Sequence, residues 1–366
     1  MSGGSAGACP RSAASQSPAR ERGGTEKSVR EITAVLVAWR DAGETESAVA
    51  SLVAARKPPG AGTLEVSLVV VDNGGGLAGR DRIESAWPGA TVLVNRVNRG
   101  LAAAANQAAG LAGGDVLLFL NPDTRAEGDP FSEIARAFEA HPEAAAVAPR
   151  LLDAEGKGRA TGALAPPDRE DQRTFQLRHL PTLRSDARNL LLLDHLFPDN
   201  AGRRNERYAA RDRETPFEVE QAAAAALAVR RDAFRKIGGF DERFFPAWFE
   251  DVDLCARLSA VGTILYWPDA RFRHRGRTSS ETLGYAAFLP IYYRNALRYR
   301  DRYTVSARWA YRILLAAGMV LRLIALPFRR SLPRSRGEAA KAYLRTLAVA
   351  SGWTPSASRR PPPDPA

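Results

Sequence analysis

Two aspartates fall where short apolar segments of the sequence are expected to end. Asp72 follows a run of valines and precedes three glycines, so its carboxylate could accept hydrogen bonds from a base or a ribose while a ligand approaches the backbone. Asp123 follows the apolar segment 115–120 within Asn121-Pro122-Asp123. One carboxylate beside phosphates is a typical way to hold Mg²⁺ or Mn²⁺. Each aspartate could instead serve only as a turn residue or a helix cap.

A third acidic site places Glu250, Asp251 and Asp253 within four residues, next to aromatic and apolar side chains. The helix dipole favours negative charge in a first turn, so capping accounts for one acid more easily than for three. Crowded carboxylates that are shielded from water acquire separated pKa values, which is what a general base requires. His274 lies among arginines and aromatic residues, where it could serve a metal or a diphosphate, or only pack.

Alternating apolar segments and helical patterns must position these residues. The segments 32–39, 66–71, 90–94 and 115–120 predict buried strands, and helical patterns lie between them. This alternation with short turns predicts an α/β fold, with a largely parallel sheet covered by helices on both faces. Ligands of such sheets bind outside the carboxyl ends of the strands.

Two further patterns follow along the chain. A helix is expected over 250–259 and a strand over 262–267, while 150–216 is an irregular excursion rich in Pro, Arg, Asp and Gly.

The positive charge of the 366 residues is concentrated at one end. Lys and Arg number 52 and Asp and Glu 41, which gives a net charge of +11, and residues 298–366 hold 14 of the basic and 3 of the acidic residues. The remainder is therefore neutral and offers no basic face for nucleic acid, so we expect no nucleic-acid partner.

The termini and the cysteines carry less information. Two cysteines, Cys9 and Cys255, cannot build a disulfide framework, which favours a reducing compartment. No secretory signal is visible, and 1–29 and 353–366 have the composition of disordered tails.

Taken together, these segments resemble the family 2 glycosyltransferases, inverting enzymes with the GT-A fold, and within them the rhamnosyltransferase-like and galactofuranosyltransferase-like branch. The first similar block starts at Asn98-Arg99-Gly100-Leu101, passes Asn106 and Gly114-Asp115, and ends at Leu120-Asn121-Pro122-Asp123. It is similar to the family pattern N-x-G-[FL]-[AG]-x-A-x-N, then GD, a strand and LNPD. The second block covers 229–257 and includes the run of acids. The resemblance extends over about residues 31–303.

The resemblance implies a nucleoside-diphosphate sugar donor, UDP- or dTDP-linked, and a glycan or lipid-linked acceptor in cell-surface polysaccharide assembly. Asp123 would take the place of the family's DxD motif as a ligand of Mg²⁺ or Mn²⁺, and His274 resembles a second ligand. Asp251 matches the catalytic base of a single inverting displacement, with Glu250 and Asp253 supporting the acceptor side. The implied nucleotide-sugar residues are Val37, Ala38, Trp39, Asp72, Asn98, Gly100 and Asn121.

The sequence also departs from the family pattern. The family usually has D-N-x-S-x-D after the second strand, whereas this chain has Asp72-Asn73-Gly74-Gly75-Gly76 and lacks the Ser and the second Asp. The first strand ends in Trp39 where the family usually has Asn. These changes affect the residues expected to recognise the nucleobase of the donor. They leave the expected metal ligands and the expected catalytic base in place.

The basic segment 304–352 is expected to form amphipathic helices that associate with a membrane. Its apolar stretch 309–328 contains Arg312 and Arg322, which share one helix face with Arg308, and Pro327 ends the helix. Residues 308–326 would reach roughly 28 Å, with Arg322 inside the hydrocarbon if the helix crossed a bilayer.

An interfacial helix with its arginines toward anionic headgroups is the better interpretation. It predicts a cytoplasmic protein held peripherally at the inner face of the cell membrane. The alternative is a helix that packs on the catalytic domain with its arginines in solvent.

Other classes of function remain as alternatives. A non-catalytic sugar-nucleotide-binding protein would explain the missing Ser and Asp after Asn73. A nucleotidyltransferase shares a nucleotide-binding α/β sheet, but normally has a basic Gly-rich loop after the first strand, for which 39–44 is a poor substitute.

Overall fold

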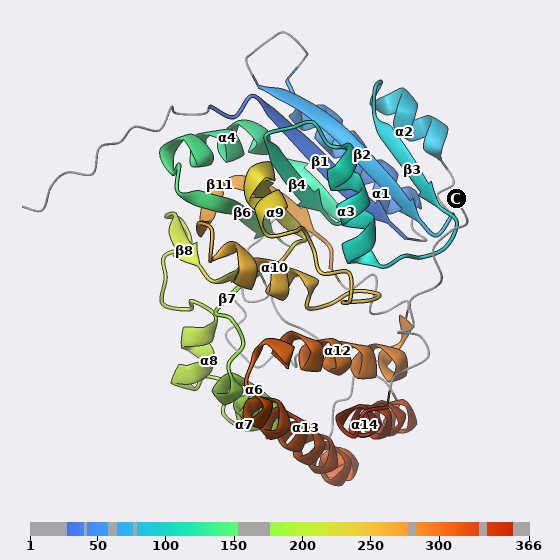
Figure 1. Cartoon of the computed structure of the whole chain (residues 1–366), viewed down its shortest axis with the longest axis vertical. Coiled ribbons are helices and arrows are strands. Elements are labelled where there is room, and N and C mark those ends of the chain that lie inside the picture. The colour runs from blue at the N-terminus through green and yellow to red at the C-terminus, as the bar shows by residue number, and fades with distance from the viewer. Residues whose placement is uncertain are drawn as a thin grey trace, which may run out of the picture.

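The computed structural model describes residues 28–39, 42–57, 64–75, 79–152, 176–276, 283–328 and 335–353. Figure 1 shows a central sheet with its helices in the upper part and a group of C-terminal helices in the lower part. Of the predicted disordered tails, residues 1–27 and 354–366 lie outside the described residues. So do residues 153–175 of the predicted excursion.

The first half of the sheet is parallel and consists of the four predicted apolar segments, in the order β3-β2-β1-β4. Runs of Val, Leu and Ile suit the three inner strands because helices cover both of their faces. The predicted burial of 90–94 is wrong, because β3 lies at the edge of the sheet and exposes Thr91 and Val94. The strands are β1 (Glu31–Ala38), β2 (Glu65–Asn73), β3 (Thr91–Asn95) and β4 (Val116–Leu120).

The second half of the sheet is mixed. β10 (Ala226–Arg230) runs antiparallel to both β4 and β6 (Ala144–Leu152), and β6 is parallel to the long β11 (Thr263–His274). Two short strands, β5 (Thr124–Glu127) and β8 (Phe217–Val219), pair antiparallel with β11. The predicted α/β fold with a mostly parallel sheet is confirmed, and its antiparallel pairs are confined to this half.

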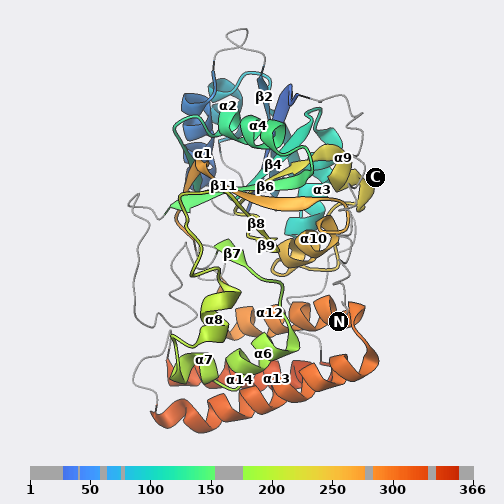
Figure 2. The same cartoon turned by 90° about the vertical axis from the view of Figure 1, so that its left-hand side faces the viewer.

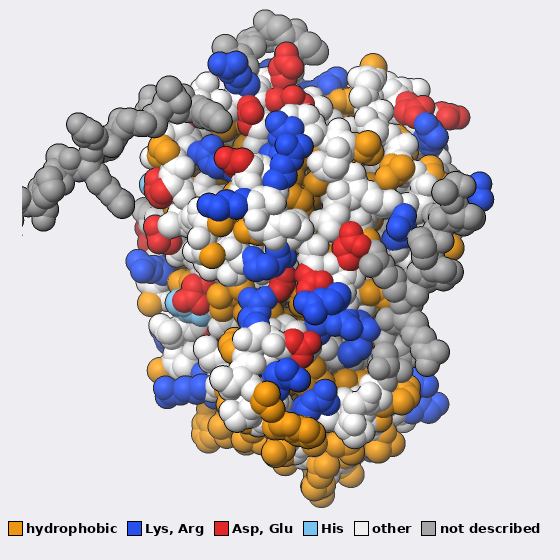
Figure 3. Space-filling model, in the orientation of Figure 1, with side chains coloured by type: hydrophobic (Ala, Val, Ile, Leu, Met, Phe, Trp, Pro, Cys, Tyr) orange, Lys and Arg blue, Asp and Glu red, His pale blue; other side chains and the backbone are white. Residues whose placement is uncertain are grey.

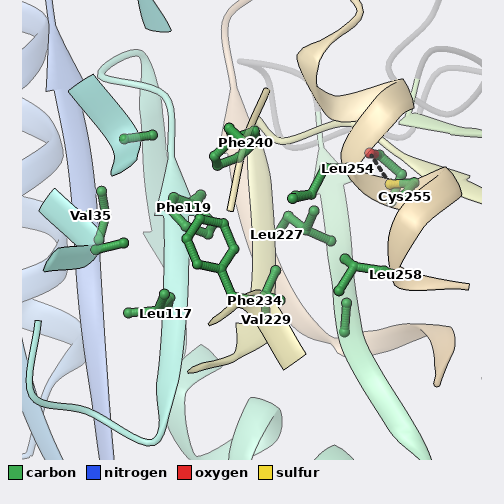
Figure 4. Packing of buried hydrophobic residues seen from close by; sticks show 14 of the residues in the cluster. Val35, Leu117, Phe119, Leu227, Val229, Phe234, Phe240, Leu254, Cys255 and Leu258 are labelled. Atoms are coloured by element: carbon green, nitrogen blue, oxygen red, sulfur yellow. Dashed lines mark hydrogen bonds between the residues drawn. The ribbon is translucent and has the colours of Figure 1, made fainter. Parts of the chain in front are cut away.

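Alternate residues of the strands build two separate cores, one on each face of the sheet. One core joins side chains such as Val35 and Phe119 to the helices α3, α9 and α10, and Figure 4 shows its packing around Phe119, Phe234 and Leu254. The other core joins Leu36 and its neighbours to α1, α2 and α4. The helices are α1 (Ala42–Ala55), α2 (Arg80–Ala86), α3 (Leu101–Leu111), α4 (Pro130–Ala140), α9 (Arg231–Lys236) and α10 (Glu250–Leu258).

A third core lies away from the sheet, between helices that the two views in Figures 1 and 2 place together at one end of the molecule. It includes Phe249 and Val252, which come from the loop before α10 and from α10 itself. The described part of the predicted excursion contributes three short helices to this end and the strand β7 (Leu177–Arg178), which pairs with β9 (Gln221–Ala222). The helices of this layer are α6 (Leu183–Leu190), α7 (Leu193–Leu196), α8 (Ala201–Glu206), α12 (Tyr285–Tyr299), α13 (Val305–Ala325) and α14 (Arg336–Ala350).

The prediction of a helix over the apolar stretch of the C-terminal segment is confirmed. Two of its arginines make contacts with the protein that the sequence does not reveal. Arg312 donates to the carbonyl of Ala350, 2.8 Å away, at the end of α14. Arg322 donates to the carbonyls of Leu190 and Asn189 at the end of α6. The carbonyls at a helix C-terminus lack partners within the helix and attract cations, so each of these two arginines directs part of its guanidinium group to the protein.

Candidate active site

The carboxyl ends of the parallel strands meet at one edge of the sheet and bring the predicted nucleotide-sugar residues together. Ala38 is the register partner of Asp72, and Leu36 is the partner of Leu120, which precedes Asn121. Trp39 extends this edge from β1, and its indole Cδ1 lies 3.3 Å from the position that a Cβ on Gly74 would take. The edge is therefore the topological site at which a ligand of an α/β sheet binds.

A network of side-chain amides supports the loop that carries Asn98 and Gly100. The amide nitrogen of Asn73 donates to Asn98 Oδ1 at 3.1 Å, and its oxygen accepts from the Arg99 N–H at 3.0 Å. Asn95 joins the network by donating to Asn73 Oδ1 and to Gln107 Oε1. The sequence analysis did not single out Asn73 and Asn95 as functional, although both are polar residues at strand ends that the sheet buries almost completely.

Gly100 occupies a position that only glycine fits. Its φ of 87° lies in the left-handed region, and a Cβ there would come within 2.8 Å of the Phe245 ring. The next residue, Leu101, donates its N–H to the Pro246 carbonyl at 2.7 Å. This hydrogen bond connects the start of α3 to the loop that leads into α10. The carboxyl edge of the parallel strands and the acidic cluster are therefore held in a fixed relation to each other.

The two predicted metal ligands are neighbours. His274 pairs with Thr124 in the β11–β5 ladder, which sets its Nε2 3.3 Å from Asp123 Oδ1 and 3.4 Å from Asn121 Nδ2. Both Asp123 and His274 are buried. The other oxygen of Asp123 accepts the Gly276 N–H at 3.0 Å, which orients the carboxylate.

This pair fits a divalent cation that takes the rest of its ligands from phosphates and water. Mg²⁺ is usually held by one or two protein carboxylates plus substrate phosphates, and Mn²⁺ accepts carboxylate as well as imidazole ligands. Within the ranges that the structure describes, no group of three or more His, Cys, Asp or Glu side chains is suited to hold a metal. Asp123 and His274 would therefore act together with the donor.

A charged pocket of about 630 Å³ opens beside Asp123. Glu44, in the first turn of α1, pairs with both Arg125 and Arg275, the latter at 2.6 Å. Arg273 and Glu127 form a further pair on its wall. Local sequence patterns do not reveal this pocket, because Glu44 and Arg275 are separated by 231 residues in the chain.

The loop before α10 presents the acidic cluster on a strained backbone. Trp248 and Phe249 are consecutive non-glycine residues with φ of 74° and 73°, a conformation that costs of order 1–3 kcal/mol per residue. Asn295 of α12 donates to the carbonyls of Ala247 and Trp248, and Arg294 donates to that of Phe245. Helix α12 thus fixes the loop that sets the position of Glu250 and Asp251.

Burial separates the behaviour of the two adjacent acids. Glu250 is buried, and burial together with the Asp251 charge raises the pKa of Glu250 well above its usual range. Its Oε2 has no hydrogen-bond partner among the described residues. Burial also raises the pKa of Asp251, but the N–H groups of Val252 and Ala224 and the charge of Arg178 oppose that rise. The arrangement favours a protonated Glu250 beside an Asp251 that ionises more readily.

The short segment Ala224-Ala225 contacts both Asp251 and the loop that carries Asp123. The Ala224 N–H donates to the Asp251 carboxylate. The adjacent Ala225 carbonyl accepts from the Asn121 N–H and from the Thr124 hydroxyl, both at 3.1 Å. Two successive alanines therefore connect the residues that flank Asp123 with the candidate base through hydrogen bonds of their backbone.

Asp253 is held differently from its neighbours. It is buried, and it forms ion pairs with Arg257, 2.7 Å away and one turn along α10, and with Arg302 beyond α12. The structure thus engages its carboxylate in a link between α10 and the helical layer. Cys255, one turn from Asp251, is fully buried, and burial raises the pKa of its thiol to about 12, so it stays protonated as a packing residue.

Comparison with known proteins shows the family and the fold of the chain. Residues 33–238 match the family described as Glycosyl transferase family 2. A curated relative from Mycobacterium tuberculosis (strain ATCC 25618 / H37Rv), N-acetylglucosaminyl-diphospho-decaprenol L-rhamnosyltransferase, is 27% identical over 321 residues, or 83% of this chain and 95% of the relative.

Two solved structures share the fold. A mannosyltransferase from Pyrobaculum calidifontis in complex with GDP-Man and Mn²⁺ is similar over 89% of this chain and 87% of its own, with a TM-score of 0.51 and 15% identity. GalNAc-T7 with UDP, GalNAc and Mn²⁺ is similar over 88% of this chain and 55% of its own, with a TM-score of 0.53 and 15% identity.

Proposed function

Because the chain belongs to glycosyltransferase family 2, we propose that it transfers a sugar from a nucleoside-diphosphate sugar to a hydroxyl of a lipid-linked or glycan acceptor. The observation that carries this proposal is the link through Ala224 and Ala225, which brings a candidate base, Asp251, next to the residues flanking Asp123. A base close to a phosphate-binding centre is what a direct sugar transfer requires.

The donor would bind along the carboxyl edge of the parallel strands. Val37, Ala38, Trp39 and Asp72 would contact the nucleoside, while Asn98, Gly100 and Asn121 would border the same site. Asp123 and His274 would hold Mg²⁺ or Mn²⁺ on the diphosphate, which would neutralise the charge of the departing nucleoside diphosphate. The Mn²⁺ in the two structural neighbours supports this assignment of a divalent cation.

Asp251 would act as the base of an inverting displacement. It accepts the proton of the acceptor hydroxyl while that oxygen attacks the anomeric carbon from the face opposite the diphosphate. The new glycosidic bond forms as the bond to the phosphate oxygen breaks, so no enzyme nucleophile is needed. Burial and the Asp251 charge raise the pKa of Glu250 well above its usual range, and a Glu250 that resists ionisation would place less negative charge beside Asp251.

The relative from Mycobacterium tuberculosis is named for a lipid-linked N-acetylglucosamine acceptor and for the transfer of L-rhamnose. By analogy we propose a rhamnosyl-type donor, dTDP- or UDP-linked, and an acceptor on a polyprenyl lipid in cell-surface polysaccharide assembly. Such an acceptor lies in a membrane, so we also propose that the protein is peripherally associated with the inner, cytoplasmic face of the cell membrane. The apolar surface of α13 supports this location.

A donor screen tests the proposal. Wild-type protein and Asp251→Asn are each incubated with Mg²⁺ or Mn²⁺, a lipid-linked acceptor and a panel of nucleoside-diphosphate sugars, and the sugar transferred to the acceptor is measured. We expect one donor to be used, activity lost on chelation of the metal, and a decrease of about 10²–10⁴-fold in Asp251→Asn, the usual contribution of a general base.

The alternatives predict other results. Equal transfer by wild type and Asp251→Asn would contradict the role of the base. Donor binding without transfer in the presence of any acceptor would indicate a non-catalytic sugar-nucleotide-binding protein, and pyrophosphate release from a nucleoside triphosphate would indicate a nucleotidyltransferase.

A further inference from the structure

The outer face of α13 is a continuous apolar surface. Large hydrophobic side chains recur on it every four or seven residues, each 43% to 83% exposed, and we call this set the α13 stripe. The stripe consists of Val305, Trp309, Ile313, Val320 and Ile324 of α13 and of Phe328 in the 3₁₀ turn that follows it. Figure 3 shows hydrophobic side chains gathered at the end of the molecule where Figure 1 places α13 and α14. An exposed apolar surface of this kind marks a site that contacts another protein or a membrane.

Helix α13 meets the length and composition of a membrane-crossing helix over Val305–Phe328, but its packing opposes a transmembrane orientation. Its inner face buries Tyr311, Leu315 and Met319 in the third core. Arg312 and Arg322 on that side bond to carbonyls of α14 and α6. These contacts hold the helix along the surface of the protein, so only the α13 stripe is available to a bilayer, as in an interfacial helix.

A pocket of about 240 Å³ adjoins the first half of the α13 stripe. It is lined by Arg308, Trp309 and Arg312 of α13 and by Ser351 and Gly352, which follow α14. The Arg312 guanidinium lies 5.9 Å from the centre of the Trp309 ring. Two guanidinium groups thus lie beside one exposed indole, directly next to the α13 stripe. Tryptophan prefers the boundary between apolar and wet surroundings, so the pocket lies where headgroups would be.

The arginines of this pocket retain donors for an anion. Arg312 uses Nη1 for the Ala350 carbonyl, which fixes the position of its guanidinium. Arg308 is 44% exposed, and its Nε is 3.8 Å from Asp301 Oδ1, a distance at which a solvated ion pair contributes little. Guanidinium forks match the oxygens of a phosphate, and a phospholipid joins such a phosphate to apolar chains.

We infer that the pocket of Arg308 and Arg312 binds the phosphate of an anionic phospholipid while the α13 stripe lies in the acyl region of the same leaflet. This inference rests on the membrane location in the proposed function and assigns a binding site that the transfer reaction does not use. It also gives the positive charge of the C-terminal segment a specific place to act. The occupant is a lipid because the two guanidinium groups and the apolar surface adjoin each other.

Vesicle flotation of the full-length protein tests the inference. Wild type is compared with the double variant Arg308→Gln/Arg312→Gln on phosphatidylcholine vesicles and on vesicles that also contain phosphatidylglycerol. The control is Arg80→Gln/Arg82→Gln, which removes the same charge from exposed positions of α2, in the upper part of Figure 1, far from α13. Ile313→Glu/Ile324→Glu tests the α13 stripe itself.

We expect the pocket variant to bind the anionic vesicles about 10–30-fold more weakly than wild type, from about 1 kcal/mol per basic residue near a charged surface. Its binding to neutral vesicles should not change, and the α2 control should bind as wild type does. The stripe variant should lose both kinds of binding. The inference is overturned if the pocket variant keeps its preference for anionic vesicles, or if the α2 control loses it equally.

Two further measurements separate the remaining explanations. A protein that fails to float on any vesicle but is a dimer by light scattering would show that the α13 stripe is covered by a second copy of the chain, which also overturns the inference. Sugar transfer to a short-chain acceptor without vesicles should be equal in wild type and in the pocket variant. If the wild-type protein transfers no sugar but still binds anionic vesicles, the proposed function is contradicted and the lipid site is not.

Discussion

The acidic start of α10 and the arginine-bearing side of α13 each collect three like charges on one helix, and the structure satisfies them to very different degrees. Arg312 and Arg322 of α13 bond to carbonyls at the ends of neighbouring helices. On α10, the buried Glu250 keeps an oxygen without a hydrogen-bond partner among the described residues, and burial raises the pKa of Asp251. Charges that are satisfied stabilise the architecture, whereas charges held at a cost mark the chemistry.

Asp253 is the exception on α10, because it forms ion pairs with Arg257 and Arg302. Removing its charge in Asp253→Asn leaves Arg257 and Arg302 without their shared partner, so we expect the free energy of unfolding to fall by about 3 kcal/mol. Urea denaturation followed by circular dichroism measures this loss. Arg302→Gln, whose side chain is 32% exposed, is the control and should cost less. Unchanged stability together with abolished transfer would place Asp253 among the catalytic acids instead.

Arg322 tests the other side of the comparison. Arg322→Gln removes charge-assisted hydrogen bonds to the carbonyls of Leu190 and Asn189, and we expect a loss of about 1–2 kcal/mol in the free energy of unfolding. Arg204→Gln, an exposed arginine of α8 with the same change in charge, should have almost no effect. If instead Arg322→Gln keeps its stability and loses vesicle binding, the arginines of α13 face lipid, as the sequence alone suggests.

The smallest expected effect is the pH dependence of kcat/KM, because it is seen only at acidic pH. Burial raises the pKa of Asp251, and a base must be ionised, so kcat/KM should fall as the pH is lowered through that raised pKa, above the range of an ordinary aspartate. A pH–rate profile measures the midpoint. Glu250→Gln should change the midpoint little, because burial and the Asp251 charge raise the pKa of Glu250 well above its usual range and so oppose its ionisation. A midpoint that moves to lower pH in this variant would mean that Glu250 is charged.

Much of the sheet could be predicted from the sequence because its signals are local. The strands β1, β2 and β4 are short apolar runs, and burial on both faces by helices produces such runs directly. The reversal at β10 could not be predicted, since a strand of the same composition pairs in either direction and its partners β4 and β6 are distant in the chain. Sequence patterning gives a strand's existence more readily than its neighbours.

The candidate site divides in the same way. The positions of Asp123, Asp251 and His274 were accessible through a resemblance in local motifs. The contacts that support them were not, because Asn295 reaches the loop before α10 from 47 residues away, and Glu44 reaches Arg275 from 231. For α13, helical spacing shows correctly that Arg312 and Arg322 share a side, but spacing contains no information on what that side contacts.

The shared third core has a practical consequence for anyone who wishes to shorten this protein. Tyr299 and Leu297 of α12, with Phe249 and Val252 at the start of the acidic helix, pack against residues of α13 and α14 such as Tyr311 and Tyr343. A chain cut after residue 303 would keep every motif of the transferase but expose this interior to water. A shortened version for expression or crystallisation should therefore keep the last helices. Solubility is better improved by substituting polar residues for the exposed apolar residues on the outer face of α13.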